Sequence, residues 1–187
     1  MLVEAAFTLF GEDGEAGLAV RAVCRKAELH IRYFYENFAD SGELLAAIYD
    51  RQATALAEIL ERVVEAAGPE TEAQTRAGIR GVLQFISDDP RRGRVLFTEA
   101  RGNEVLAARR RAAETALLDV VIASGSEPRD GPRLPVLVTA MMFTGAMSEL
   151  AQQWADGRLG NDLDAVVDHA VELSLALHRT ALKLASD

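Results

Sequence analysis

The stretch AELHIRYFYENFADSGELL, residues 27–45, decides the fold of this chain. Within it, Ile31, Phe34 and Phe38 recur at helical spacing, so they share one face of a short helix over about residues 30–38. The opposite face carries polar and aromatic side chains, with Tyr35 at the boundary: Arg32, Tyr33, Glu36 and Asn37. A helix that only fills a core does not need this mixture, so the outer face is expected to meet a partner.

The residues on either side of this helix predict a helix-turn-helix. Upstream, apolar stripes indicate helices over residues 2–10 and 18–26, followed by a tight turn at residues 27–29. Downstream, Asp40 with Glu43 three residues later forms a capping box that opens a long helix over residues 40–67. In a helix-turn-helix the second helix enters the major groove of DNA, where arginine, tyrosine and asparagine suit bases and phosphates.

The remainder of the chain is also predicted to be helical, so the expected fold class is all-α. The helices are expected at about residues 72–87, 91–98, 103–124, 134–156 and 162–185. Three of the five prolines fall in residues 125–135, which is the clearest linker. We place a helix-turn-helix domain at residues 1–48 and a ligand-binding and dimerisation domain at residues 49–187.

Composition limits where and how the protein acts. The net charge of −9 argues against indiscriminate binding to nucleic acid, although residues 18–38 hold four Lys or Arg against two Glu. The single cysteine, Cys24, lies on an apolar stripe and is expected to be a buried structural thiol in a reduced, cytoplasmic protein. The longest uncharged apolar stretch, near residues 136–147, is too short to span a membrane.

Several spacings together resemble the DNA-binding domain of the TetR family of transcriptional regulators. The matching segments are AAFTLFGEDG (5–14), VRAVCRKAEL (20–29) and YFYENFADSGELL (33–45), and RYFYENFAD resembles a branch with Arg-Tyr-Phe-Tyr in the recognition helix. The resemblance covers residues 2–51. It implies a homodimeric regulator, usually a repressor, that binds a palindromic operator and whose carboxy-terminal helices dimerise and hold a small ligand.

The resemblance also assigns roles to individual residues by position. It implies that Arg21, Tyr35 and Asn37 contact phosphates, that Arg32 and Tyr33 approach the bases, and that His30 begins the recognition helix. Two positions differ from the family pattern. Ser41 stands where a DNA-contacting lysine is usual, and Glu28 stands where the turn usually has glycine. An alternative for Arg32 is a simple pair with Glu36 on a solvated helix.

The helix over residues 134–156 predicts a ligand site, because it carries three of the four methionines and the only tryptophan. Methionine-rich and aromatic surfaces accept hydrophobic ligands, and Arg101 could hold an anionic group. The expected lining is Phe85, Phe97, Arg101, Met141, Phe143, Met147 and Trp154; ordinary core packing is the alternative for each. The last two helices are apolar over more than one face, so we expect them to form a four-helix dimer interface with a second copy.

Signatures of other functions were not found. The sequence has no phosphate-binding loop, dinucleotide fingerprint, zinc-protease motif or nucleophile elbow, so we expect no enzyme activity, cofactor or metal. The arginines at positions 91, 92 and 94 and at 109–111 are interpreted as solvated faces paired with nearby acids. The alternative function is a helical small-molecule binding or interaction protein that has lost DNA binding, suggested by Glu28, Ser41 and the lack of a basic arm before Leu2.

Overall fold

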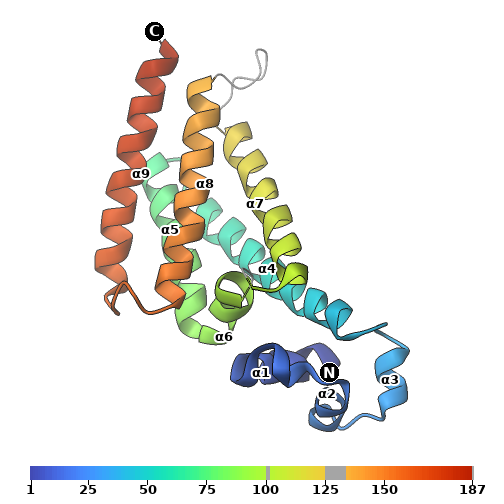
Figure 1. Ribbon diagram of the computed structural model, residues 1–187. Helices are drawn as coiled ribbons and strands as arrows, with labels where there is room; N and C mark the ends of the chain where they lie inside the picture. Colours follow the sequence, from blue (N-terminus) through green and yellow to red (C-terminus); the bar gives the residue numbers. More distant parts are fainter. Residues whose placement is uncertain (100–101, 125–133, 187) are drawn as a thin grey trace.

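The computed structural model describes residues 1–99, 102–124 and 134–186, and within these ranges the protein is all-α, without strands (Figure 1). This confirms the predicted fold class. The elements are α1 (Leu2–Asp13), the 3₁₀ turn η1 (Gly14–Leu18), α2 (Val20–Lys26), α3 (Ile31–Tyr35), α4 (Ser41–Ala66), α5 (Thr71–Asp88), α6 (Pro90–Gly93), the π-helical turn η2 (Arg94–Thr98), α7 (Glu104–Ser124), α8 (Leu134–Ala155) and α9 (Leu163–Ser186).

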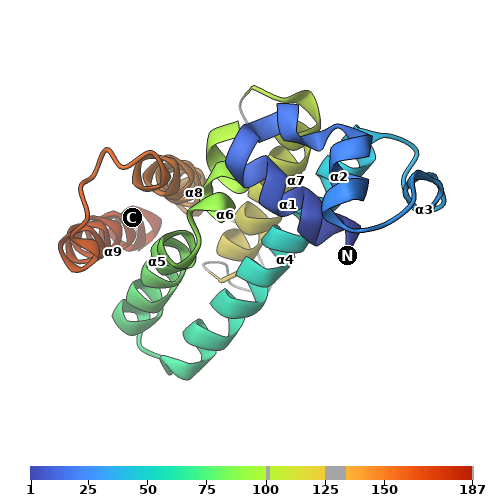
Figure 2. The same cartoon turned by 90° about the horizontal axis from the view of Figure 1, so that it is seen from below.

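The helices lie in two groups that α4 joins. α1, α2 and α3 form a compact foot, while α5, α7, α8 and α9 stand above it (Figures 1 and 2). α5 packs against α4 and α9, and α8 packs against α5, α7 and α9. Seen from below, α3 lies at the edge farthest from α8 and α9 (Figure 2). α3 thus lies well away from α8 and α9 (Figure 2).

The start of α4 has the capping box that the sequence predicts. The Asp40 carboxylate accepts a hydrogen bond from the Glu43 backbone N–H at 2.9 Å, and Glu43 accepts one from the Ala39 N–H at 2.6 Å. These bonds satisfy backbone donors that a helix otherwise leaves without partners. They fix the point where the chain leaves the foot and begins α4.

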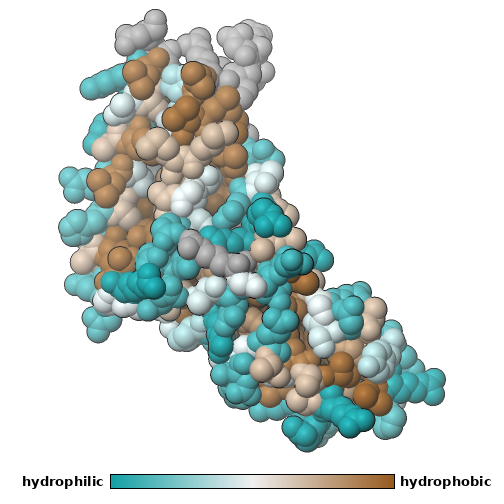
Figure 3. Space-filling view, viewed as in Figure 1, coloured by the Kyte–Doolittle hydropathy of each residue, from teal (hydrophilic) through white to brown (hydrophobic). Residues whose placement is uncertain are grey.

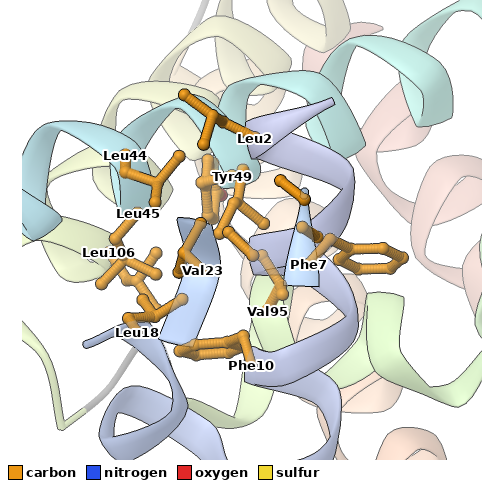
Figure 4. Packing of buried hydrophobic residues seen from close by; sticks show 14 of the residues in the cluster. Leu2, Phe7, Phe10, Leu18, Val23, Leu44, Leu45, Tyr49, Val95 and Leu106 are labelled. Atoms are coloured by element: carbon orange, nitrogen blue, oxygen red, sulfur yellow. The ribbon is translucent and has the colours of Figure 1, made fainter. Parts of the chain in front are cut away.

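The larger core lies in the foot and continues into the upper helices (Figure 4). Phe7 and Phe10 of α1, Phe34 of α3 and Leu44 of α4 are buried in it. The same cluster contains Phe85 of α5, Val95 and Leu96 of η2, and Leu106 of α7. The boundary proposed at residue 48 thus lies inside the continuous helix α4 and inside a shared core.

A second, smaller core joins α5, α8 and α9. Its buried residues are Ile79, Leu83, Met147, Val167 and Val171. Thr144, Met147 and Ala151 of α8 are buried, whereas Val138, Met141 and Met142 on the same helix are exposed. By length and composition, α8 is the one helix among the described residues that could cross a membrane, which differs from the expectation based on its uncharged stretch near residues 136–147 because the helix extends to Ala155. Most of the predicted linker, residues 125–133, lies outside the described residues.

Candidate nucleic-acid interface and ligand site

The turn between α2 and α3 is closed by a pair of backbone hydrogen bonds. The Leu29 N–H donates to Cys24 O at 2.9 Å, and the Glu28 N–H donates to Arg25 O at 3.2 Å. This is the Schellman arrangement of a helix end, in which the residue after the cap is left-handed. Here that residue is Glu28, with φ 55°. The position demands the glycine-like conformation although the side chain is glutamate.

α3 presents the two faces that the sequence predicts. Phe34 is buried, and Ile31 and Phe38 pack against the same core. The polar and aromatic residues of the opposite face are exposed: Arg32, Tyr33, Tyr35, Glu36 and Asn37. The regular α-helix ends at Tyr35, three residues earlier than expected, but backbone bonds continue the turn to Phe38. The outer face is thus open to a partner as large as DNA.

Local contacts hold the side chains of this face. His30 caps α3, because its Nδ1 accepts a hydrogen bond from the Arg32 N–H at 3.3 Å. Arg32 forms an ion pair with Glu36 at 2.8 Å, yet the arginine side chain is 81% exposed. The pairing that we considered as an alternative is therefore present. An exposed pair of this kind is worth little, so it leaves Arg32 able to exchange Glu36 for a base or phosphate.

The other predicted DNA-contacting side chains differ in whether they are exposed or already bonded within the protein. Arg21 on α2 is exposed. The Ser41 hydroxyl, in contrast, is half-buried and donates a hydrogen bond to Leu18 O at 3.0 Å. Asn37 donates from its side chain to Tyr33 O at 2.8 Å, which fixes its amide beside the recognition face. Cys24 is buried, as expected of a structural thiol.

Two arginines after α5 tie the upper helices to α1. Arg91 lies over the Phe7 ring at 4.6 Å and donates to the Thr8 hydroxyl at 3.3 Å. Its side chain also bonds Asp89, and these hydrogen bonds hold the pKa of Asp89 below its usual range. Arg94 donates to Gly11 O at 2.9 Å. These side chains pair with acids as predicted, but they are partly buried between helices and do not form a solvated face.

Glycines in α1 and at its end leave room for these arginines. A Cβ at Gly11 would lie 2.4 Å from the Arg91 side chain, so only glycine permits this approach. Gly14 has φ 64°, and a Cβ there would lie 2.7 Å from the Arg94 guanidinium. The Gly11 and Gly14 positions, which the family resemblance covers, therefore serve the contact between α1 and the α6–η2 segment.

The residues predicted to bind a ligand fall into separate places. Phe143 and Trp154 pack around buried Met147 in the core of α5, α8 and α9, and the Trp154 indole donates to Ser87 at 3.0 Å. Phe85 and Phe97 belong to the larger core. Met141 is 57% exposed on the outer side of α8, so it does not line a site with the others. Arg101 lies outside the described residues.

A polar cluster between α7 and α8 was not predicted from the sequence. Arg110 bonds Glu114 and the Ser148 hydroxyl, each at 2.8 Å, and donates to Phe97 O at 3.2 Å. The Ser148 hydroxyl donates to Glu114 at 2.6 Å. Burial raises the pKa of Tyr49, on α4 beside this cluster, to about 12. The sign available in the sequence was that the polar residues Thr144, Ser148 and Gln152 recur every four positions and therefore share one face of the helix.

A cavity of about 330 Å³ lies elsewhere, at the junction of the foot with α4 and α7. Its walls include Ser41, Glu15 and Asn103, and the Asn103 amide donates to the Glu15 carboxylate at 2.9 Å. Ser41 is the one residue of the predicted sites that lines it. Among the described residues, no group of three or more His, Cys, Asp or Glu side chains is placed to hold a metal ion.

Comparison with known proteins identifies the fold. No family model matches this sequence, and the search of curated proteins found no match. Solved structures do match. A TetR-like transcriptional regulator from Rhodococcus sp. RHA1 is 21% identical with a TM-score of 0.70, over 93% of this chain and 91% of that one. The fatty acid degradation regulator FadR from Bacillus halodurans is 15% identical with a TM-score of 0.74, over 93% and 92%.

A third structure adds a bound ligand to the comparison. It is the transcriptional regulator FadR from Bacillus subtilis in complex with stearoyl-CoA, 18% identical with a TM-score of 0.71, over 92% of this chain and 95% of that one. The fold of this chain is that of TetR-like transcriptional regulators. It comprises a three-helix helix-turn-helix domain joined by a long fourth helix to a helical domain.

Proposed function

We propose that this chain is a DNA-binding transcriptional regulator, a repressor that a small hydrophobic ligand releases from its operator. The observation that best supports this proposal is the outer face of α3, where Arg32, Tyr33 and Asn37 are exposed while Phe34 is buried in the core. Arg32 and Tyr33, so presented, can approach base edges in the major groove, and Asn37 can contact a phosphate. Arg21 and Tyr35 flank them as phosphate contacts, and His30 fixes the start of the helix.

The fold comparison supports the ligand-responsive part of this proposal. A regulator of similar fold is described in complex with stearoyl-CoA, which is a property of that protein. In this chain, the helices that would surround a ligand are linked to the foot by Arg91 and Arg94. A ligand that shifts η2 or α7 would therefore displace α1, and with α1 the recognition helix. The protein would act in the cytoplasm, where its operator is.

We propose further that the active form is a homodimer built from α8 and α9. Val138, Met141 and Met142 on α8 and Leu173 and Leu184 on α9 are exposed. Figure 3 faces these two helices and shows apolar surface along both. Exposed apolar area of this extent marks an interface, and a second copy would cover it with the same helices. A twofold dimer would place two α3 helices on a palindromic operator.

Fluorescence anisotropy with labelled DNA from the region upstream of the gene tests the DNA-binding function. Wild type should bind that DNA more tightly than random DNA of equal length, and Arg32→Ala should lose this difference. Equal binding of wild type to both DNAs, across salt concentrations, would refute the proposal.

The alternative function is a helical small-molecule binding protein that no longer binds DNA. The orientation of the Ser41 hydroxyl toward Leu18 O favours it, because the residue at the lysine position then offers nothing to a phosphate. Ser41→Lys distinguishes the two functions. If the protein is a DNA-binding regulator, this substitution should increase its affinity for DNA several-fold. If the protein has no DNA site, the substituted protein should still not bind DNA.

A further inference from the structure

The cavity of about 330 Å³ between the foot and α7 has walls from three segments of the chain. η1 with Ala19 forms one wall, the start of α4 forms the second, and the start of α7 forms the third. Leu18, Leu45 and Val105 contribute apolar surface, and a Cβ at Gly42 would lie 3.7 Å from the Val105 side chain. Small-molecule sites begin at about this volume. The cavity therefore has room for a small organic molecule that contacts both the foot and α7.

Oxygen atoms that accept hydrogen bonds lie in two of these walls. The Glu15 carboxylate accepts a bond from the Asn103 amide at 2.9 Å, and this amide carries no charge. The Asn103 Oδ1 accepts bonds from two backbone N–H groups at the start of α7, at 2.9 and 3.1 Å, which fixes the amide toward Glu15. The Ser41 hydroxyl donates to Leu18 O, so its own oxygen remains able to accept. The walls thus offer a carboxylate and a hydroxyl oxygen to a ligand that donates.

The charge around the cavity is negative. Glu15 has the one ionisable side chain among the described residues that line it. The segments that form the three walls, residues 11–19, 39–46 and 102–108, hold six Asp or Glu and no Lys or Arg. Like charges gathered around a cleft raise the local concentration of the opposite ion. The cavity is therefore better suited to a cation than to a neutral molecule of the same shape.

We propose that this cavity is a second ligand site, which binds a small organic cation: an ammonium group on a compact apolar body. The ammonium group donates to Glu15 and Ser41, and the apolar body lies against Leu18, Leu45 and Val105. This site is separate from that of the hydrophobic ligand in the proposed function, and its occupation can be measured without DNA.

The bound cation also has a regulatory consequence, which rests on the proposed DNA-binding function. It neutralises a carboxylate beside Ser41, the position at which the family resemblance implies a contact with DNA. Repulsion between this carboxylate and the phosphates then falls, so DNA binds more tightly to the occupied protein. By thermodynamic linkage, DNA raises the affinity for the cation by the same factor.

Three probes with the same phenyl body test the preference for a cation: 2-phenylethylamine, 2-phenylethanol and phenylacetate. At pH 7 the first is a cation, the second is neutral and the third is an anion. Calorimetric titration without DNA, at low salt, should give an affinity for the amine about fivefold higher than for the alcohol, the upper end of what one exposed ion pair contributes. This preference should shrink as the salt concentration rises.

Two glutamates provide the variant and its matched control. Glu15→Gln keeps an acceptor for Asn103 but removes the charge, so it should abolish the preference for the amine. Glu12→Gln removes an equal charge from α1, at a residue that does not line the cavity, and should keep the preference. Ala16→Phe places a ring in the cavity wall and should weaken binding of all three probes. Thermal midpoints verify folding, and if a variant does not fold, the three probes on wild type still decide.

Several results would overturn the cation site. They are no binding of the amine, an affinity for the alcohol or phenylacetate equal to or above that for the amine, and an unchanged preference in Glu15→Gln. Binding that Ala16→Phe leaves unchanged would place the amine outside the cavity, with the same consequence.

The regulatory part is tested by anisotropy titrations with DNA from the region upstream of the gene. The amine should tighten DNA binding of wild type about twofold, because an exposed carboxylate acts weakly through salt solution, and should have no effect on Glu15→Gln. An unchanged DNA affinity with a preserved preference for the amine refutes the regulatory part alone. A preserved preference in a protein that binds no DNA refutes the DNA-binding function and leaves the cation site standing.

Discussion

Replacement of Glu28 by glycine should stabilise the protein. Glu28 has φ 55° at the end of α2, and the bond from Leu29 N–H to Cys24 O requires that conformation. A side chain in the left-handed region costs about 1–2 kcal/mol, which Glu28→Gly removes. Glycine also gains about 0.5–1 kcal/mol of conformational freedom in the unfolded chain, which opposes the benefit. The free energy of unfolding should therefore rise by about 0.5–1 kcal/mol.

The matched control is Glu28→Ala, which removes the same charge but keeps a Cβ in the left-handed conformation. For a chain of this length, the expected gain for Glu28→Gly is about 1–4 °C in thermal midpoint, whereas Glu28→Ala should show no gain. Urea unfolding gives the free energies directly. Equal stability of the two variants would mean that the turn is not strained by its side chain.

The same pair of variants separates backbone strain from charge in DNA binding. Both substitutions leave four basic residues against one acid in residues 18–38. Less repulsion of the phosphates should tighten binding of both variants to any DNA, to a similar degree and more at low salt. If only Glu28→Gly binds more tightly, turn geometry controls the affinity. If neither does, Glu28 lies away from the DNA.

Three further predictions test other parts of the structure. Arg32→Ala should weaken binding to operator DNA by on the order of 1–3 kcal/mol and relax sequence specificity. Arg21→Ala should weaken binding to all DNA and reduce the salt dependence of the affinity by about one unit of slope. Anisotropy titrations measure both effects, and equal losses of affinity for operator and random DNA in Arg32→Ala would contradict a base contact. Leu173 is 72% exposed on α9, and Leu173→Glu should yield monomers in sedimentation at micromolar concentration. The control Leu159→Glu, in the α8–α9 connection, should remain a dimer. Dimers in both variants would exclude this face of α9 as the dimer interface. Burial raises the pKa of Tyr49 from 10 to about 12 in the folded protein, so the unfolded chain loses this proton at lower pH than the folded one. The free energy of unfolding should therefore be unaffected by this group below pH 10 and should fall by about 2–3 kcal/mol as pH rises toward 12. Urea unfolding should show this extra fall relative to Tyr49→Phe, and parallel pH dependences of the two proteins would mean that another group titrates.

The foot could be predicted from the sequence because its determinants are local. The capping box of Asp40 and Glu43 involves residues three apart, and the division of α3 into a buried and an exposed face follows from helical periodicity alone. Both are confirmed by the structure. The left-handed conformation of Glu28 was harder to foresee, because glutamate gives no sign of it and only the family's glycine pointed to that position.

The ligand domain was less predictable because its helices have more than one neighbour. On α8, Met141 is exposed and Met147 is buried, yet both are methionines in an apolar helix. Periodicity separates two faces, but it does not say which face meets the core and which meets another chain. Arginine is similarly ambiguous. Arg110 looked solvated in the sequence, and only the packing of α7 on α8 brings Ser148 to it.

The contacts around η2 explain why a structural change in α7 or α8 is expected to affect the helix-turn-helix formed by α1, α2 and α3. Phe97 O accepts a hydrogen bond from Arg110, and Arg94, one turn earlier, donates to Gly11 O at the end of α1. On the other side of η2, the Thr98 hydroxyl bonds Asp156, just after α8, at 2.8 Å. π-helical turns such as η2 are rare in proteins and frequently lie at functional sites. We therefore expect that a movement of α7 or α8 would displace η2, which is bonded to α1 through Arg94, and would reach α3 through the core that α1 and α3 share.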